Sequence, residues 1–218
     1  MSILAPQVMD GGLVRRLNPG DILAGMEPPI PATDTTNTTL SYTAANIIGS
    51  TVYVRNPAGV STDTFPTADA LITAISSGIG TSQVSPGLTF RLRIINLSAN
   101  LLTGAVTANT GVTLTRGNVL ASSSKEFLFT ITNGTPLRTC TGITTTNASA
   151  VLGGFSDTDI KNLSIGMVVT NAVAGQQGNT IIGINAASNT VTMSGNSNAT
   201  STVSPTFSPT YTIVGLAA

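Results

Sequence analysis

Short stretches of alternating apolar and polar residues recur along this chain, and clusters of Asn, Gly, Ser and Pro separate them. At residues 125–132, for example, Phe127, Phe129 and Ile131 occupy alternate positions. A period of two places every second side chain on the same face of a strand. Short strands joined by turn residues are typical of antiparallel sandwiches and barrels, so the sequence predicts an all-β protein.

Residues 37–140 hold most of the predicted strands and are predicted to form the main domain. Its predicted strands are residues 38–42, 51–55, 88–96, 101–107, 112–115, 119–121, 125–132 and 137–143, with a brief helical turn at 44–48. The pattern favours an antiparallel β-sandwich and leaves open a jelly-roll, an immunoglobulin-like or a Greek-key strand order. Because strands and helices do not alternate regularly, a Rossmann-type sheet is not predicted.

One short helix is predicted in this domain, at residues 66–76. Leu71, Ile72 and Ile75 fall on one face of it, and glycines follow its last turn. Thr64 is the candidate N-terminal cap. The helix is therefore expected to cover part of the sandwich with an apolar face.

Residues 141–218 are predicted to form a second, smaller unit. Its predicted strands are residues 167–170, 180–185, 190–193, 202–203 and 211–214. Residues 186–189 are a predicted hairpin turn, and residues 156–163 a short capped helix or turn. The pattern indicates a small β-barrel or two-sheet sandwich, which at this size gains stability by packing against the first domain or a neighbouring subunit.

Residues 1–36 are rich in both proline and apolar residues. Proline fixes φ and removes a backbone donor, so this segment is not predicted to enter a helix or a central strand. We predict an extended arm that lies on a partner protein, with a strap across the chain's own sheet as the alternative. Its candidate partner-binding residues are Leu13, Val14, Arg15, Arg16, Leu17, Ile22, Leu23 and Met26.

Arg91 and Arg93 are the other candidate partner-binding residues. They lie two positions apart on the predicted strand 88–96 and therefore share its outer face. One interpretation is a solvated face that discourages edge pairing. The other is a docking patch for acidic groups on a partner.

Charged residues make up only 8% of the chain, against roughly 25% in typical proteins, and residues 162–218 contain none. The chain has no histidine, which excludes a Ser-His-Asp triad, a histidine base and histidine metal ligands. The acidic residues are scattered, and no phosphate-binding glycine loop is present. The sequence predicts a protein that is not an enzyme and needs no cofactor or metal. Its formal net charge of zero favours association with other proteins.

Nucleic acid and membranes are not predicted as partners. Nine Lys and Arg residues in the whole chain provide no clustered basic face for phosphates. No apolar run reaches the about 18 residues of a membrane-spanning helix. The first residues lack the pattern of a signal peptide, so synthesis in a cytoplasm is expected.

Two local features have simple structural explanations. Cys140 is the only cysteine, and it is predicted to be a small buried residue rather than a reactive thiol. Asp157 and Asp159 are predicted to lie at a helix start, where capping and the helix dipole favour Asp. A share in a Ca²⁺ site is the alternative for these two residues.

In its style of sequence the chain resembles structural proteins of tailed-bacteriophage virions. The resemblance is carried by residues 35–40, 44–49, 67–72, 87–96, 110–114 and 122–127 in the first domain, and by residues 163–169 and 179–184 in the second. It implies a β-sandwich on the outside of the virion, namely a capsid cement or decoration protein. It further implies a homotrimer bound to the major capsid protein, with the arm crossing the seams between capsomers. A head-fibre, tail-fibre or receptor-binding component is the alternative.

Overall fold

The computed structural model describes residues 7–10, 13–16, 33–35, 40–48, 52–80, 83–103 and 109–216. The chain divides into two compact units, Met1–Ile30 and Pro31–Ala218. Four candidate residues of the predicted arm, Leu17, Ile22, Leu23 and Met26, lie outside the described residues.

The first unit contains a β-hairpin, where the proline pattern predicted an extended arm. Strand β1 (Gln7–Asp10) pairs antiparallel with β2 (Leu13–Arg16), and Asp10 is the partner of Leu13. Only Gly11 and Gly12 separate the two strands in the sequence, and a two-glycine connection is typical of tight hairpins. A two-stranded hairpin is at best marginally stable by itself, so we expect the stability of this one to depend on further contacts.

A six-stranded sheet forms the centre of the second unit, with the order β3-β5-β7-β10-β19-β9. Its strands are β3 (Thr33–Asp34), β5 (Val52–Arg55), β7 (Thr89–Asn96), β10 (Ser123–Asn133), β19 (Thr210–Gly215) and β9 (Val112–Thr115). Strand β10 pairs antiparallel with β7 and with β19. The pairs β3–β5, β5–β7 and β9–β19 are parallel.

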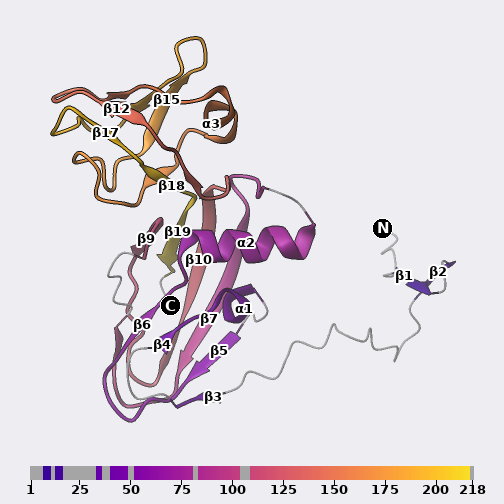
Figure 1. Ribbon diagram of the computed structural model, residues 1–218. Helices are drawn as coiled ribbons and strands as arrows, with labels where there is room; N and C mark the ends of the chain where they lie inside the picture. The colour runs from indigo at the N-terminus through magenta and orange to yellow at the C-terminus, as the bar shows by residue number, and fades with distance from the viewer. Residues whose placement is uncertain are drawn as a thin grey trace. The chain divides into compact units, whose positions relative to one another are not determined.

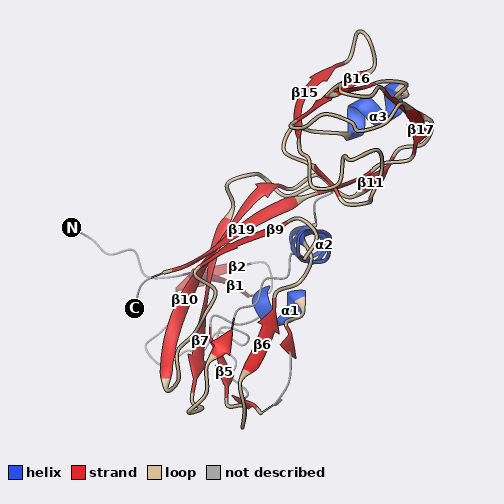
Figure 2. Cartoon of the chain, turned by 90° about the vertical axis from the view of Figure 1, so that its left-hand side faces the viewer, coloured by secondary structure: helices blue, strands red, loops and turns tan. Residues whose placement is uncertain are grey.

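Two helices cover one face of this sheet (Figures 1 and 2). They are α1 (Ala44–Ile48) and α2 (Ala68–Ile79), and a small parallel sheet of β4 (Leu40–Ser41), β6 (Ser61–Thr64) and β8 (Leu102–Thr103) accompanies them. The hydrophobic core includes Tyr42, Ile47, Phe65, Leu71, Leu92, Phe127, Phe129, Ile131 and Tyr211. The predicted alternation in β10 is confirmed, because Phe127, Phe129 and Ile131 are all fully buried.

Helix α2 is the predicted helix, with its start moved by two residues. Leu71, Ile72 and Ile75 are buried as expected. The cap is Thr67, whose side chain accepts a hydrogen bond from the Ala70 N–H, and not Thr64, which belongs to β6. The helix ends at Ile79, and Gly80 caps it in the left-handed backbone conformation that suits glycine.

The predominantly β prediction is confirmed, but the pairing is not antiparallel throughout. Five strand pairs in the second unit are parallel. Parallel pairing of β5 with β7 is possible because β6 and α2 form a long crossover between them. Alternation along one strand specifies which side chains face the core, but not the direction of its neighbour, and this is why the sequence missed it.

A C-terminal module, residues 138–208, has its own sheets and its own core. Its elements are β11 (Arg138–Thr139), β12 (Ile143–Thr145), β13 (Val151–Leu152), α3 (Asp157–Asn162), β14 (Val168–Val169), β15 (Ile181–Asn185), β16 (Thr190–Met193), β17 (Ser201–Val203) and β18 (Thr206–Ser208). They pair as β11-β18-β14, β12-β17 and β13-β16-β15. The predicted hairpin at residues 186–189 is confirmed, because Asn185 pairs with Thr190. The core includes Ile143, Leu152, Met167, Ile181, Val191 and Phe207.

The C-terminal module is inserted between two neighbouring strands of the first sheet. Strand β19, predicted as part of the second unit, instead pairs antiparallel with β10 and parallel with β9. Asn133 at the end of β10 is the partner of Thr210 at the start of β19. The alternation of Tyr211 and Ile213 predicted a strand correctly, but no feature of the nearby sequence identifies β10 as the partner of that strand. The predicted second unit, residues 141–218, therefore has the wrong C-terminal boundary.

This insertion predicts that the module can be removed. Replacing residues 134–209 by Asn-Gly leaves β10 and β19 joined by a two-residue turn of the type that hairpins favour. We expect a protein that still unfolds cooperatively, destabilised by about 2 kcal/mol because only a few polar contacts are lost. Far-UV circular dichroism with urea titration measures this. An unfolded product would mean that the sheet requires the module.

Candidate interaction site

The face of the six-stranded sheet opposite the helices is a broad surface of exposed and partly exposed side chains, which we call the outer face. Its residues are Thr89, Arg91, Arg93 and Ile95 of β7, Ser124, Glu126, Leu128 and Thr130 of β10, Thr212 and Val214 of β19, and Thr113 and Thr115 of β9. Each alternates with a residue that faces the core. The outer face is therefore a threonine-rich surface with aliphatic side chains and two arginines.

Arg91 and Arg93 lie together on this surface, as the sequence predicted. Arg91 donates a hydrogen bond to Glu126 at 2.6 Å. Arg93 lies directly opposite Glu126 in the strand register, but it donates to the Ser124 hydroxyl, from Nη2 at 2.8 Å. The Arg91–Glu126 pair is well exposed, so it adds at most about 1 kcal/mol to stability. In the described part of the chain, the Arg93 charge is not neutralised by a carboxylate in a salt bridge.

The remaining candidate residues belong to the first unit. Leu13, Val14, Arg15 and Arg16 form β2, with Val14 opposite Met9 in the register. The structure thus places these four candidates on one strand of a hairpin.

Beside the sheet lies a buried charge network that the sequence reasoning missed. The Arg55 guanidinium is fully buried and holds Asp63 with two hydrogen bonds, Nε to Oδ2 and Nη2 to Oδ1, both at 2.9 Å. Arg55 Nη1 contacts Asp34 Oδ1 at 3.0 Å. The Tyr42 and Ser61 hydroxyls also donate to Asp63, at 2.9 and 2.8 Å. This network ties β5, β6 and β3 together.

The surroundings of the network keep Tyr42 and Arg55 protonated. Burial, followed by the charge of Asp63, raises the pKa of Tyr42 well above its ordinary value, so the phenol remains a donor. Burial by itself would lower the pKa of Arg55, but the hydrogen bond and the charge of Asp63 outweigh it, and the pKa is raised. Strand β6 reads Ser-Thr-Asp-Thr, so it lacks the apolar alternation by which the other strands were found.

Cys140 is buried, as predicted. Burial raises the pKa of its thiol to about 12, and the nearby charge of Asp159 adds to this effect. Because the thiolate is the reactive form of cysteine, the thiol is protonated and inert at neutral pH.

Asp159 belongs to the capping box at the start of helix α3, which confirms the prediction of a helix start. The Ser156 side chain accepts a hydrogen bond from the Asp159 N–H, and the Asp159 side chain accepts one from the Ser156 N–H, which completes a capping box. Arg138 Nη2 also donates to Asp159 at 2.7 Å. Burial of the Asp159 carboxylate acts to raise its pKa, but the hydrogen bonds from Ser156 and Arg138 prevail and lower it.

This lowered pKa predicts an acid-sensitive contribution to the stability of the module. A carboxylate with a depressed folded-state pKa stabilises the fold above its unfolded pKa of about 3.9 and loses that effect as the pH falls through the folded value. We expect Asp159→Asn to cost about 1 kcal/mol at neutral pH and almost nothing at strongly acidic pH. Urea unfolding across this pH range tests it, with the exposed Asp157→Asn as control. A cost that persists in acid would assign the effect to packing.

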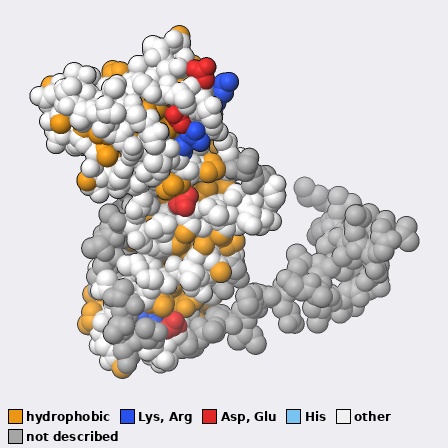
Figure 3. Space-filling view, in the orientation of Figure 1, with side chains coloured by type: hydrophobic (Ala, Val, Ile, Leu, Met, Phe, Trp, Pro, Cys, Tyr) orange, Lys and Arg blue, Asp and Glu red, His pale blue; other side chains and the backbone are white. Residues whose placement is uncertain are grey.

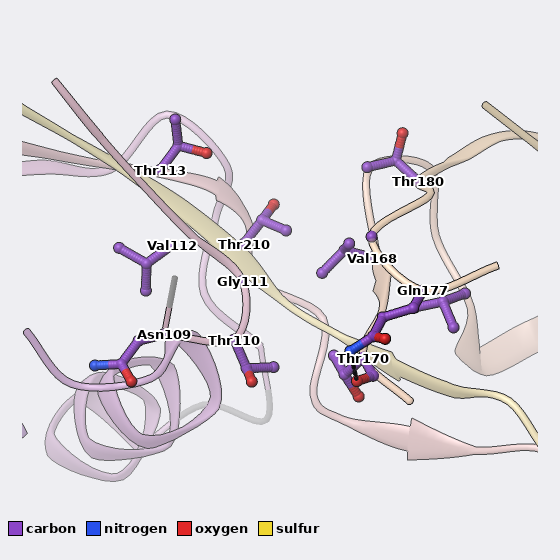
Figure 4. A pocket seen from close by; sticks show the side chains of 12 residues that line it. Asn109, Thr110, Gly111, Val112, Thr113, Val168, Thr170, Gln177, Thr180 and Thr210 are labelled. Carbon is purple, nitrogen blue, oxygen red and sulfur yellow. Dashed lines mark hydrogen bonds between the residues drawn. The ribbon is translucent and has the colours of Figure 1, made fainter. Parts of the chain in front are cut away.

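A cleft of about 380 Å³ lies between the first sheet and the C-terminal module, lined by uncharged side chains (Figure 4). Thr110, Thr113 and Thr210 line one side of it, and Thr170 and Thr180 the other. Hydroxyl and amide groups can hydrogen-bond a ligand, but they are poor acids and bases at neutral pH.

The surface of the molecule is also poor in charge, because few charged side chains appear on the face shown in Figure 3.

The described residues form neither a metal site nor a membrane-spanning helix. No group of three His, Cys, Asp or Glu side chains lies where it could hold a metal ion. Among the helices that the structure describes, none is long and apolar enough to cross a membrane.

Compared with protein-family models, with curated proteins and with solved structures, the chain matches none of them.

Proposed function

We propose that this chain is a structural virion protein that binds the outside of a bacteriophage capsid and stabilises it by bridging neighbouring capsid subunits. The outer face of the six-stranded sheet is the observation that carries this proposal. It offers a broad surface of short hydroxyl side chains around the aliphatic residues Ile95, Leu128 and Val214. The resemblance of the sequence to virion proteins supports a capsid protein as the partner.

The physical character of this surface suits protein binding. Threonine has little side-chain entropy to lose on contact, whereas lysine or glutamate loses more. Arg93 can reach a carboxylate on a partner, because its present acceptor is a neutral hydroxyl, and charge-assisted hydrogen bonds are stronger than neutral ones. Interfaces gain specificity from such placed charges and affinity from the apolar residues between them.

The first unit supplies the second contact in this proposal. Its hairpin pairs four residues of each strand, and pairing with a sheet edge on a partner would extend this small sheet. The partners are the major capsid protein and other copies of the chain, assembled as a trimer on the virion exterior. No catalytic step is part of this function.

A head-fibre or tail-fibre component is the second candidate function. The C-terminal module favours it, because it exposes the aliphatic side chains of Val151, Ile165 and Ile182. An exposed apolar side chain on a module at one end of a chain suits contact with a receptor. The same module would be displayed outward from the shell in a cement protein.

The number of copies in purified virions separates the two functions. On the order of hundreds of copies per particle supports a cement protein, and a few to a few dozen copies support a fibre. The reason is that the copy number of a virion protein follows the symmetry of the site that it occupies. Absence of the chain from particles contradicts both.

A charge-reversing variant then tests the outer face. We expect Arg93→Glu combined with Leu128→Asp to bind capsids at least about tenfold more weakly, since a buried charge lacks a partner and an apolar contact is lost. Lys161→Glu, an exposed charge reversal on the module, is the matched control. Equal binding by the two variants would exclude the outer face as the docking surface.

A further inference from the structure

The end of the sheet farthest from the C-terminal module carries exposed aliphatic side chains that the proposed function does not use. We call it the distal tip; it consists of the loops at residues 56–60, 97–101 and 117–122. Val60 and Leu120 are each 66% exposed, and Leu97 is 55% exposed. Side chains of this size are usually buried, so a group of three on one end of a domain requires an explanation.

Strand register shows that two of these side chains belong to one row. Ser61 of β6 pairs with Leu102 of β8, and Leu102 bridges Val119. All three of these residues are buried. Because successive side chains point to opposite faces, the residues next to them, Val60, Leu101 and Leu120, lie in a row that faces away from the core.

Buried polar groups hold the three loops in place. Asn96 is 1% exposed, and its Nδ2 donates to the Asn100 carbonyl at 2.7 Å and to the Leu120 carbonyl at 3.0 Å. The Ser98 hydroxyl donates to Asn96 Oδ1, and the Ser122 N–H donates to the Ser98 carbonyl. These bonds link two of the loops directly.

The third loop is fixed through the buried arginine. The Leu97 N–H donates to the Arg55 carbonyl at 2.9 Å, and the Ser61 N–H donates to the Leu101 carbonyl. Arg55 and Asp63 in turn fix β5 against β6. Loops fixed before contact lose little entropy on binding, which favours affinity. The distal tip is thus a preorganised apolar surface.

The composition and size of the tip limit what can cover it. Its three loops contain no Asp, Glu, Lys or Arg, so the complementary surface is uncharged and apolar. A stable pair of proteins buries about 800 Å² per partner through about 20–30 residues a side, and the tip is smaller than that. It cannot hold two free copies together by itself, but it can add to other contacts made by the same chain on a repeating surface.

We infer that the distal tip docks on an uncharged apolar patch of the capsid subunit. This inference rests on the proposed function. Strand β10 runs from the tip, where Ser123 pairs with Asn96, to the module, where Asn133 contacts Ser164. Its 11 residues span about 35 Å. The tip thus adds a contact at one end of the outer face, and the C-terminal module lies at the other end of β10.

The experiment measures binding of the full chain to particles produced without it. The test variant is Val60→Asp with Leu120→Asp, and Ile182→Asp, a 56% exposed aliphatic residue on the module, is the matched control. Co-sedimentation gives the affinity, and thermal unfolding confirms that each variant folds. Leu120→Gln is a milder version of the same change if the double variant does not fold.

We expect the tip variant to bind at least about tenfold more weakly and the Ile182→Asp control to bind like the original chain. The loss should persist at high salt, because apolar contacts are not screened. Normal binding by the tip variant overturns this inference and leaves the proposed function intact. If the original chain itself does not bind particles, both fail. If the tip variant loses only self-association in ultracentrifugation, the occupant is a second copy and the inference is wrong.

Discussion

Replacing Asp63 by alanine is expected to lower the free energy of unfolding by about 3–5 kcal/mol, because it leaves the Arg55 guanidinium buried without its main counter-charge. Arg55 is fully buried, and Asp63 accepts two of its hydrogen bonds. The same change also removes the acceptor of the Tyr42 and Ser61 hydroxyls. Urea unfolding followed by circular dichroism measures the loss.

Two further variants make this result specific. Asp69→Ala removes a carboxylate from the first turn of α2, where it is only partly buried, and should cost less than about 1 kcal/mol. Arg55→Met combined with Asp63→Leu should recover part of the stability, because a buried ion pair is often replaceable by apolar residues of similar size. A loss of under 1 kcal/mol for Asp63→Ala would mean that water reaches the arginine.

Phe129→Ala is expected to cost about 3–5 kcal/mol, the loss typical of a fully buried phenylalanine. Its ring lies at the centre of the aromatic cluster, with ring centroids 4.8 Å from Phe90, 5.4 Å from Phe65 and 6.1 Å from Tyr211. These contacts join β10 to β7 and β19, and to the chain segment that leads into α2. The cavity would therefore weaken the packing of both layers.

Leu128→Ala is the matched control, since Leu128 is the adjacent residue of the same strand and lies on the outer face. We expect it to cost about 1 kcal/mol, clearly less than Phe129→Ala, because Leu128 is only partly buried and lies outside the hydrophobic core. Urea midpoints of the two variants give the comparison. Similar losses for both would indicate that the outer face is covered by another part of the chain.

The faces of the main strands were predictable from the sequence. Alternation is a local property, so the spacing of Phe127, Phe129 and Ile131 was enough to place them in the core, and the spacing of Arg91 and Arg93 was enough to place them outside. The helix face of Leu71, Ile72 and Ile75 followed from the helical period in the same way. Cys140 and the helix start at Asp159 followed from the ordinary behaviour of these residue types.

The candidate site was only partly predictable. The exposure of the two arginines was predicted from the sequence. Only the alignment of β7 with β10 shows that Arg91 forms a salt bridge with Glu126, whereas Arg93 donates to the neutral Ser124 hydroxyl. The row of Val60, Leu101 and Leu120 joins loops from three distant parts of the sequence. The polar strand β6 was missed because its buried side chains are Ser61 and Asp63. Polar side chains are not expected in a core from the sequence, and their burial is explained only by the Arg55 guanidinium that they contact in the fold.

The sequence by itself determined that this chain is built of short strands, which side chains most of them bury, and that its surface has few charges. Only the tertiary structure decided which strands are neighbours: it returned β19 to β10 across the whole C-terminal module, made β5 and β7 parallel, and paired Arg55 with Asp63. The physical reason is the distance along the chain over which each effect acts. Periodicity, capping and turn preferences act between residues a few positions apart, whereas strand partners are chosen by packing between segments that can lie far apart in the sequence. Even the Arg55–Asp63 pair, only eight positions apart, depends on how β5 packs beside β6.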